Sequence, residues 1–310
     1  MRPRRRSLFF AALWARCFAS PSRPGKWVEP ETSGVRVWTI HYRTRDGFRS
    51  AAYVILPGWY GPHDNPPFPL VISPHGRGLS GRANVHRWGD LPSDGEFAVV
   101  NPDGHGRVLR LYSWGYPGQI DDLARMPEIV EHALPWLRID RARVYAFGAS
   151  MGGQETLLLA ARHPSLLAGA AAFDPVTDLA RRYCEFSDVP CNAECARRWG
   201  APIGAGLQTL AREEIGGTPA TARSAYAARS PITYSRRLAD SGVPLELWWS
   251  RKDRIVMDQR HQSVSLLRAL LRLNPWAPVH GVAGSWRHSY DMREYALLMP
   301  ALRRFDLLPK

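Results

Sequence analysis

The region that follows the N-terminal segment shows the alternation of apolar and polar residues that is typical of strands. Residues 35–42 alternate with a period of two, and residues 51–56 form a second, mostly apolar run. Asp46 and Gly47, between the two runs, form a turn signal. Because alternation places one face of a strand on the core and the other in water, the pattern predicts an antiparallel hairpin.

Further along, short apolar runs alternate with segments of helical spacing. The runs have the length and composition of buried strands and comprise residues 70–73, 98–101, 144–147, 168–173, 245–249 and 278–282. Residues 119–137 carry a helical pattern that Pro127 interrupts, and residues 256–272 carry another with an apolar face. Strands that alternate with helices form parallel sheets through right-handed crossovers. The pattern therefore predicts an α/β fold in which helices flank a mostly parallel central sheet.

The periodicity breaks down between about residues 177 and 230. This stretch contains Cys184, Cys191 and Cys195 together with prolines and glycines. It follows a predicted strand at the edge of the sheet where binding loops concentrate. We expect a small cap-like insert over this edge, and a plain surface insertion is the alternative.

The strongest chemical signal is the run Gly-Ala-Ser-Met-Gly at residues 148–152. It lies between a predicted strand and a predicted helix. In that context G-x-S-x-G is typical of a nucleophile elbow, in which Gly148 and Gly152 let the strand and the helix approach closely. Ser150 is therefore the candidate nucleophile.

A serine hydroxyl needs a histidine to accept its proton and a carboxylate to orient that histidine. In this architecture the chain order is serine, acid, histidine. Asp253 follows the predicted strand 245–249, and His288 lies on the loop after the last predicted strand. We assign Asp253 as the orienting carboxylate and His288 as the general base and then the general acid. Asp174, after an earlier strand, is the alternative acid, although a turn that leads into the insert is its more natural role.

The loop after the strand 70–73 predicts an oxyanion hole. Its residues are Pro-His-Gly-Arg-Gly at positions 74–78. The backbone N–H of Met151 and that of either Gly76 or Arg77 would hold the negative oxygen of a tetrahedral intermediate. The sequence leaves the choice between Gly76 and Arg77 open.

Aromatic residues close to these loops are candidates for substrate contact. Trp114 and Tyr116 follow a strand edge together with Tyr112, and Trp286 is near His288 in the chain. They could line a pocket for an aromatic acyl or prolyl group, although packing explains such residues equally well.

The other histidines predict structural roles rather than chemistry. His163 precedes a proline at the expected end of a helix, His75 lies in the predicted oxyanion loop, and His86 and His105 lie in polar or glycine-rich loops. No pair of His, Cys, Asp or Glu has a metal-ligand spacing such as H-E-x-x-H, and no dinucleotide-binding or phosphate-binding loop occurs. We therefore expect neither a metal nor an organic cofactor.

Charge changes this interpretation little. The 310 residues carry a formal net charge of +13 at pH 7. Residues 1–26 hold seven basic residues and no acid, and the arginines elsewhere are dispersed along a chain with few lysines. Dispersed arginines favour a bias in residue usage over a binding patch. We expect no nucleic-acid partner.

Residues 1–25 have the pattern of a targeting segment, with arginines at the start, an apolar run over residues 8–15 and small residues after it. We expect export of a hydrolase domain that spans residues 26–310, and a basic disordered tail on a cytoplasmic protein is the alternative. No segment elsewhere approaches the ~18 apolar residues of a membrane span. Cys17 would leave with a signal peptide. The other three cysteines allow at most one mutual disulfide, which we expect if the protein is exported.

These motifs resemble the α/β-hydrolase fold and, within it, the catalytic domain of the prolyl oligopeptidase family. The segments that carry the resemblance are the hairpin that ends at Leu56-Pro57, His75-Gly76, residues 118–122, residues 148–153, residues 230–234, Asp253 and His288. The resemblance covers most of the chain and implies a serine peptidase or an esterase. Arg77 departs from the family pattern, which has a second glycine there. We also expect no N-terminal propeller, and hence no size filter on peptides.

The sequence as a whole predicts a serine hydrolase that cleaves a small-molecule ester or a peptide or amide bond through an acyl-enzyme on Ser150. A catalytically inactive hydrolase fold that serves as a binding module is the alternative from a different class. A third hypothesis is a basic protein that binds anionic polymers or membranes, with an affinity that falls steeply as salt is added.

Overall fold

The computed structural model of the protein describes residues 26–28, 34–188, 204–288 and 297–309. In these ranges one sheet has the strand order β1-β2-β3-β5-β4-β6-β7-β8-β9. The strands are β1 (Lys26–Val28), β2 (Val35–Arg43), β3 (Arg49–Pro57), β4 (Phe68–Ile72), β5 (Ala98–Pro102), β6 (Ile139–Ala149), β7 (Gly169–Phe173), β8 (Leu245–Ser250) and β9 (Val279–Gly284). Strands β1, β2, β3 and β5 pair antiparallel, and every pair from β5 through β4 to β9 is parallel. The predicted hairpin and the predicted mostly parallel sheet are both confirmed.

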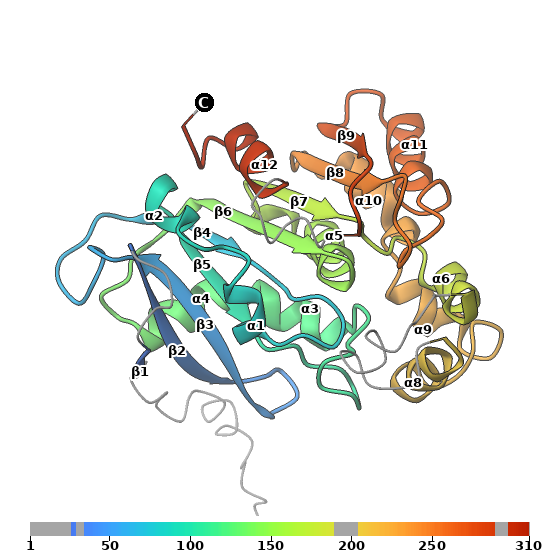
Figure 1. The fold of residues 1–310 in the computed structure, drawn as a ribbon, viewed down its shortest axis with the longest axis horizontal. Helices are drawn as coiled ribbons and strands as arrows, with labels where there is room; N and C mark the ends of the chain where they lie inside the picture. The colour runs from blue at the N-terminus through green and yellow to red at the C-terminus, as the bar shows by residue number, and fades with distance from the viewer. Residues whose placement is uncertain (1–25, 29–33, 189–203, 289–296, 310) are drawn as a thin grey trace, which may run out of the picture.

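Helices cover both faces of this sheet (Figure 1). Their bounds are α1 (Gly81–Val85), α2 (Leu91–Gly95), α3 (Pro117–Ala124), α4 (Met126–Ala133), α5 (Met151–Arg162), α6 (Leu179–Glu185), α8 (Ala205–Ile215), α9 (Arg223–Ala228), α10 (Ser235–Asp240), α11 (Ser263–Leu273) and α12 (Leu298–Arg304). Short 3₁₀ turns occupy η1 (Pro164–Leu166), η2 (Phe186–Asp188) and η3 (Pro231–Tyr234). Two hydrophobic clusters result, one with α3, α4, α5, α10 and α11, and one with α2 and α12.

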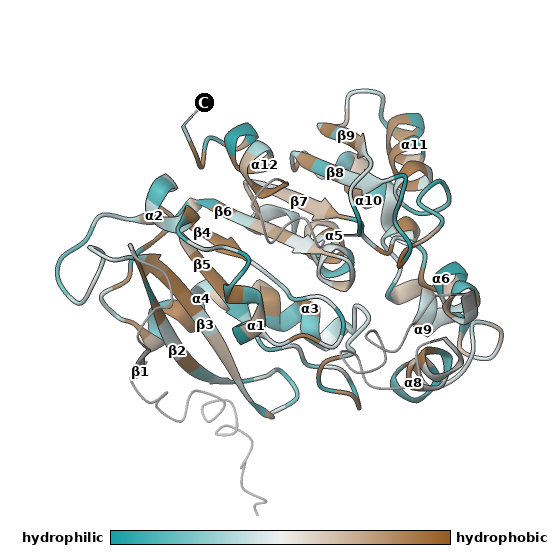
Figure 2. Cartoon of the chain, in the orientation of Figure 1, coloured by the Kyte–Doolittle hydropathy of each residue, from teal (hydrophilic) through white to brown (hydrophobic). Residues whose placement is uncertain are grey.

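Strand β4 shows how the sheet divides its residues between the two clusters. Leu70 and Ile72 belong to the cluster with α3 and α5, whereas Val71 belongs to the cluster with α12. Successive side chains of a strand point to opposite faces, so a strand covered on both sides must be apolar throughout. The strands near the centre of the sheet are accordingly coloured hydrophobic in Figure 2. This explains why the central strands form continuous apolar runs in the sequence.

One predicted helix is interrupted near Pro127 as expected, and another begins later than expected. The segment 119–137 forms α3 and α4 with a break at Arg125, because Pro127 occupies the first turn of α4, where its missing N–H does no harm. The segment 256–272 becomes helical only from Ser263. The residues before Ser263 form a loop of turns, and this loop carries Asp253.

The stretch predicted as an insert leaves the sheet after β7 and contains α6, α8 and α9. In Figure 1, β6 and β7 point toward these helices. A third hydrophobic cluster joins Leu179, Leu207 and Tyr226 of the insert to Trp114 and Met151 of the main domain. The insert therefore packs beside the residue that follows Ser150.

Several predictions concern residues outside the described ranges. They include the targeting segment 1–25 with Cys17, and the pairing of Cys191 and Cys195. Cys184 is exposed and forms no disulfide within the part of the chain that the structure describes. A search of the same residues finds no helix with the length and hydropathy needed to cross a membrane.

Candidate active site

Ser150 occupies a sharp turn between β6 and α5. Its φ of 58° and ψ of −120° lie in a region that side chains rarely adopt. The backbone N–H of Ser150 donates to the carbonyl of Phe173 at 2.8 Å, so the neighbouring strand β7 holds the turn. The conformation is that of the nucleophile elbow expected from the sequence.

The two glycines of the elbow are required by contact with backbone atoms. A Cβ at Gly148 would lie 2.2 Å from the carbonyl oxygen of Gly152, and a Cβ at Gly152 would lie 2.2 Å from that of Pro74. No real Cβ tolerates such distances. The strand, the helix and the loop after β4 can therefore meet at Ser150 only because both positions lack a side chain.

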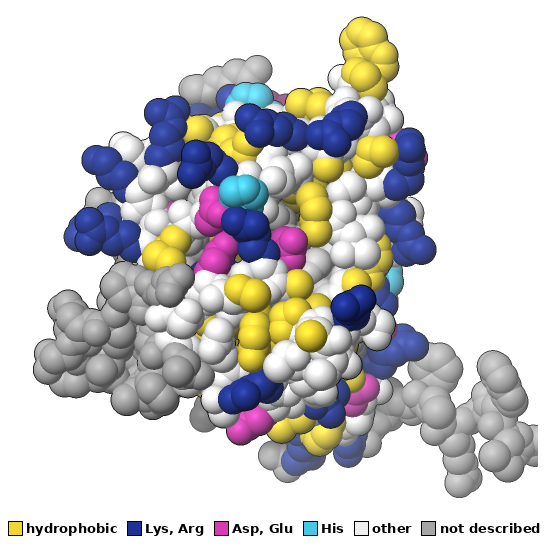
Figure 3. Space-filling view, turned by 90° about the vertical axis from the view of Figure 1, so that its right-hand side faces the viewer, with side chains coloured by type: hydrophobic (Ala, Val, Ile, Leu, Met, Phe, Trp, Pro, Cys, Tyr) yellow, Lys and Arg dark blue, Asp and Glu magenta, His cyan; other side chains and the backbone are white. Residues whose placement is uncertain are grey.

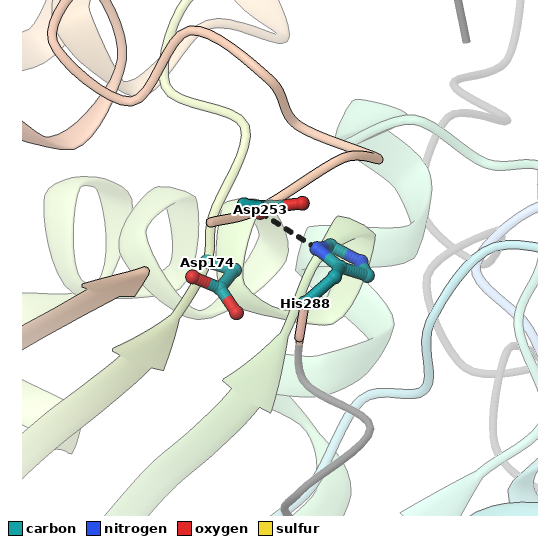
Figure 4. A group of neighbouring side chains, drawn as sticks. All are labelled: Asp174, Asp253 and His288. Atoms are coloured by element: carbon teal, nitrogen blue, oxygen red, sulfur yellow. Dashed lines mark hydrogen bonds and ion pairs between the residues drawn. The ribbon is translucent and has the colours of Figure 1, made fainter. Parts of the chain in front are cut away.

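His288 and Asp253 are hydrogen-bonded to each other and buried. Nδ1 of His288 lies 2.8 Å from Oδ2 of Asp253, and Figure 4 shows the bond. The other oxygen of Asp253 accepts the backbone N–H groups of Ile255 at 2.7 Å and Val256 at 3.0 Å. A carboxylate on Nδ1 favours the tautomer that carries its proton there, in which Nε2 is unprotonated and can act as a base.

These residues lie at the carboxyl edge of the parallel strands. Ser150 follows β6, Asp253 follows β8, and His288 follows β9. The structure brings Asp253 and His288 into direct contact, and it places Ser150 at the same edge of the sheet. Catalytic groups of open α/β sheets gather at this edge.

Asp174, the alternative acid, lies beside the same pair. A carboxylate oxygen of Asp174, a carboxylate oxygen of Asp253 and a ring nitrogen of His288 all lie within 4.8 Å of one another. Asp174 accepts the backbone N–H of Ser250 and the indole N–H of Trp286, both at 2.8 Å. Nδ1 of the imidazole is bonded to Asp253, and Asp174 lies beside this pair as a second carboxylate.

The same three residues bear on the expectation that no metal is bound. Within the described ranges they are the only group of His, Cys, Asp and Glu that is close enough to hold a metal ion. Nδ1 of His288 is bonded to Asp253. The absence of a metal stays a prediction.

The loop after β4 lies against the elbow. A Cβ at Gly76 would lie 3.8 Å from the carbonyl oxygen of Ala149, an ordinary contact. The amide of Met151 is the first of α5, and the first amides of a helix have no partner within it. Gly76, Arg77 and Met151 are thus close in the fold, as the oxyanion prediction requires. The choice between Gly76 and Arg77 stays open.

His75 fixes the backbone of that loop. The N–H of Gly104 donates to its Nε2 at 2.6 Å, so Nδ1 carries the proton and donates to the carbonyl of Gly76 at 2.8 Å. Burial lowers the pKa of His75 below its usual value, because the charged form loses its hydration. His75 is therefore a neutral scaffold residue beside the expected oxyanion site.

The predicted substrate-binding aromatics already have partners in the protein. Trp114 is buried, and its ring lies 6.1 Å from that of Phe186 in the insert. The hydroxyl of Tyr116 donates to Asp46 at 3.1 Å. The ring of Trp286 lies 6.4 Å from that of Trp248. Trp114 and Trp286 each pack in a hydrophobic cluster, and the two clusters are different. Packing within the protein therefore explains much of the contact that each ring makes.

A buried polar network behind the elbow has no counterpart among the sequence predictions. Glu155, on α5, is buried and accepts a hydrogen bond from the hydroxyl of Ser113. Burial raises the pKa of Glu155 to about 7, although hydrogen bonds from Ser113 and Gln119 oppose the rise. In the sequence, the signal that could have indicated this network is Glu155 itself, an acidic residue directly before the apolar run of α5.

The network continues into the insert through a buried ion pair. Arg229 and Glu214 lie 3.3 Å apart, with 4% and 0% of their side chains exposed. Glu214 also accepts the backbone N–H groups of Val108 at 2.7 Å and Leu109 at 2.8 Å, while Arg229 donates to the carbonyl of Ser113. These bonds tie α8 and α9 to the loop that carries Trp114.

A cavity of about 1350 Å³ lies on the other side of the loop that carries Asp253. Its charged lining residues are Arg181, Glu185, Arg251, Asp258, Arg260 and Arg268. Arg181 pairs with Asp258 at 2.7 Å. Figure 3 views the side of the molecule that lies at the right of Figure 1 and shows basic, acidic and histidine side chains next to one another there. This mixture of signs differs from the uniform basic surface that an anionic polymer would need.

Comparison with families of known sequence gives one match. The model of the prolyl oligopeptidase family matches residues 119–275, about half of the chain. The matched range includes Ser150 and Asp253, and His288 follows its end. No curated protein sequence matches the chain.

Solved structures share the fold at low sequence identity. Dipeptidyl peptidase 4 from Porphyromonas gingivalis is 18% identical with a TM-score of 0.58, and the match covers 92% of this chain and 35% of that one. Acylaminoacyl peptidase from Pyrococcus horikoshii is 16% identical with a TM-score of 0.62, covering 88% of this chain and 42% of that one. S-formylglutathione hydrolase from Staphylococcus aureus is 16% identical with a TM-score of 0.59, and the match covers 89% of this chain and 100% of that one. The fold is therefore that of the α/β-hydrolases, and the chain spans about a third of the length of the dipeptidyl peptidase.

Proposed function

The chain belongs to the prolyl oligopeptidase family, a family of serine hydrolases, and we propose that it is an active hydrolase. It cleaves a carboxylic ester or a peptide or amide bond through an acyl-enzyme on Ser150. The observation that carries the proposal is the strained turn at Ser150 on the same sheet edge as the buried His288–Asp253 pair. A non-glycine residue held at such a φ is costly and persists mainly at functional sites.

The chemistry follows from the groups at this edge. Nε2 of His288 accepts the proton of the Ser150 hydroxyl as its oxygen attacks the carbonyl carbon of the substrate. The imidazolium that forms is stabilised by Asp253, and it then protonates the leaving group. Water, activated by the same imidazole, attacks the acyl-enzyme and releases the acid. In acylation Nε2 takes the proton of Ser150 and gives it to the leaving group; in deacylation it takes a proton from water and returns it to the oxygen of Ser150.

The negative oxygen of the tetrahedral intermediate is held by backbone amides. We assign one to Met151 at the start of α5 and the other to Gly76 or Arg77. Removal of one such donor typically costs about 2.7–4 kcal/mol of transition-state stabilisation. The buried His75 supports this arrangement, because its bond to the carbonyl of Gly76 fixes the loop.

The substrate is a small ester or a short peptide. The structures similar to this chain include peptidases and also esterases such as an acetyl xylan esterase from Paenibacillus. The helices of the insert support a restricted acyl site, because they pack on Trp114 and Met151 beside the nucleophile. No metal or organic cofactor takes part in the proposed reaction.

A substrate panel with a matched variant tests the proposal. The panel combines p-nitrophenyl esters of short acids with prolyl and non-prolyl anilides. Ser150→Ala should lose at least about 10⁴-fold in kcat/KM and should no longer react with a fluorophosphonate probe. Ser265→Ala, on α11, serves as the control and should match the wild type.

Two outcomes would contradict the proposal. Equal hydrolysis by the wild type and Ser150→Ala would show that another group acts. Absence of hydrolysis together with absence of Ser150 labelling would favour the inactive hydrolase fold that serves as a binding module.

A further inference from the structure

Asp174 is a buried carboxylate that the proposed triad does not use. Its side chain is 0% exposed, and its φ of 44° lies in the left-handed region. Outside glycine, Asn and Asp adopt that region most readily, at a cost of about 1 kcal/mol or more. Figure 4 shows Asp174 beside Asp253 and His288. A buried charge in a strained conformation persists only where the surrounding structure holds it in place.

The hydrogen bonds of Asp174 reach both loops of the triad. One oxygen accepts the backbone N–H of Ser250, which ends β8 just before the loop of Asp253. The other oxygen accepts the indole N–H of Trp286, on the loop that carries His288. Each bond is 2.8 Å long. A single side chain, directly after β7, therefore connects the acid loop to the base loop.

The charge of Asp174 also acts on the imidazole. The reactive atoms of Asp174, Asp253 and His288 lie within 4.8 Å of one another in a buried site. A negative charge at such a distance favours the charged imidazolium that forms during the proposed reaction. Two carboxylates thus face one imidazole.

Other charged groups near the site balance this charge only in part. Arg182 on α6 is buried and interacts with Asp253, but it also pairs with Glu185 at 3.3 Å. Lys252 and Arg287 are exposed to solvent, which weakens their effect on the imidazole. Within the described residues, the positive charge that faces the two carboxylates is therefore smaller than their own.

We propose that Asp174 is a second carboxylate of the active site, a positioning residue that holds the loops of Asp253 and His288 together and stabilises the imidazolium of His288. This proposal rests on the function proposed above. Asp174 touches neither the substrate nor the serine in the scheme, and it acts through His288. It differs from the alternative acid considered at the sequence level, because Asp253 keeps the bond to Nδ1.

Two variants separate the charge of Asp174 from its hydrogen bonds. Asp174→Asn removes the charge and keeps a side chain that tolerates the left-handed backbone. Trp286→Phe removes the indole donor and leaves the charge in place. The measurement is kcat/KM for a p-nitrophenyl ester between pH 5 and 9, with the thermal midpoint of each variant.

The two variants should differ in pH dependence. We expect Asp174→Asn to lower kcat/KM by about tenfold or more at neutral pH and to move the acidic limb of the profile down by about one pH unit. Trp286→Phe should lower kcat/KM severalfold with the limb unmoved. A role in folding alone would not move the limb, because the position of the limb does not depend on how much protein is folded.

Some outcomes would overturn the proposal. An acidic limb in Asp174→Asn that coincides with that of the wild type would reduce Asp174 to a scaffold residue. If Asp174→Asn does not fold, unchanged kcat/KM in Trp286→Phe contradicts the positioning role, and a loss supports it. Failure of the proposed function is distinct, because the wild type would then show neither hydrolysis nor labelling of Ser150.

Discussion

At the scale of single residues, the site depends on the missing side chains of Gly148 and Gly152 as well as on the hydroxyl of Ser150. Ser150 supplies the oxygen, but the absence of side chains at Gly148 and Gly152 lets three segments meet around it. The buried acids Glu155 and Asp174 both follow this turn in the chain. The behaviour of single substitutions follows from these contacts.

Gly152→Ala tests the close packing of the elbow. The added Cβ would lie 2.2 Å from the carbonyl oxygen of Pro74, which is backbone and cannot rotate away. We expect the loop that carries Gly76 to shift, with a loss of about 100-fold in kcat/KM and about 1–3 kcal/mol in the free energy of unfolding.

Gly61→Ala is the matched control for that variant. A Cβ there meets only side-chain atoms, at 3.5 Å and beyond. Its activity and stability should stay close to those of the wild type. Wild-type activity in Gly152→Ala would show that the loop does not contribute to catalysis.

Glu155 should make the stability of the protein depend on pH. Burial raises the pKa of Glu155 in the folded state to about 7, from an ordinary value of 4.5. Between these two values the folded state keeps the proton and the unfolded state loses it. The contribution of Glu155 to the free energy of unfolding should therefore be largest below pH 4.5 and be lost as the pH rises through about 7.

Urea denaturation of Glu155→Gln over that pH range checks this prediction. In the variant, the free energy of unfolding should no longer show the decrease of about 1–3 kcal/mol that Glu155 causes over this pH range. Glu213→Gln removes an exposed carboxylate on α8 and should keep the decline. Equal slopes in the wild type and Glu155→Gln would contradict the prediction.

At the scale of elements, α8 and α9 are fastened to the main domain by charge as well as by apolar packing. Glu214 accepts backbone N–H groups of Arg107, Val108 and Leu109 and pairs with Arg229. A buried carboxylate with this many donors acts as a fixed anchor. The insert is therefore attached to the main domain at this point, and it packs on Trp114 and Met151.

Glu214→Ala tests the anchor. Arg229 would be left buried without its partner, and removal of one member of a buried pair typically costs about 3–5 kcal/mol. Urea denaturation should show that loss, and proteolysis within residues 204–230 should become faster. Glu213→Ala, the exposed neighbour on α8, is the control. Wild-type stability of Glu214→Ala would show that apolar packing alone holds the insert.

At the scale of the whole molecule, the sheet gathers residues that are far apart in the chain. The strand order places β6, β7, β8 and β9 side by side and parallel. The loops after them carry Ser150, Asp174, Asp253 and His288, so one edge of one sheet collects all four.

Metal removal provides a test at this scale. The only candidate metal group among the described residues is Asp174, Asp253 and His288, and Nδ1 of His288 is bonded to Asp253. We expect dialysis against EDTA to leave kcat/KM unchanged, because the proposed mechanism uses only protein groups. Loss of activity that added Zn²⁺ restores would instead indicate that Asp174, Asp253 and His288 bind a metal.

Much of the fold was predictable because local patterns decide it. Alternation at residues 35–42 and the apolar runs of the parallel strands correspond to β2 and to the strands of the sheet. The elbow at Ser150 was predictable for the same reason, since its glycines act on neighbouring segments of backbone. The late start of α11 was not predictable, because Asp253 holds Ile255 and Val256 in turns that an apolar periodicity cannot reveal.

The sequence by itself determined which segments become strands, where the chain turns sharply and which serine stands at that turn, because near-neighbour sterics and side-chain periodicity act over a few residues. The tertiary structure alone decided that Asp253 bonds to His288 while Asp174 connects their loops, and that Glu155, Glu214 and Arg229 are buried together. Asp174 and Asp253 each follow a strand, so no local pattern distinguishes them. The register of β7, β8 and β9 and the paths of their loops determine which carboxylate reaches the imidazole.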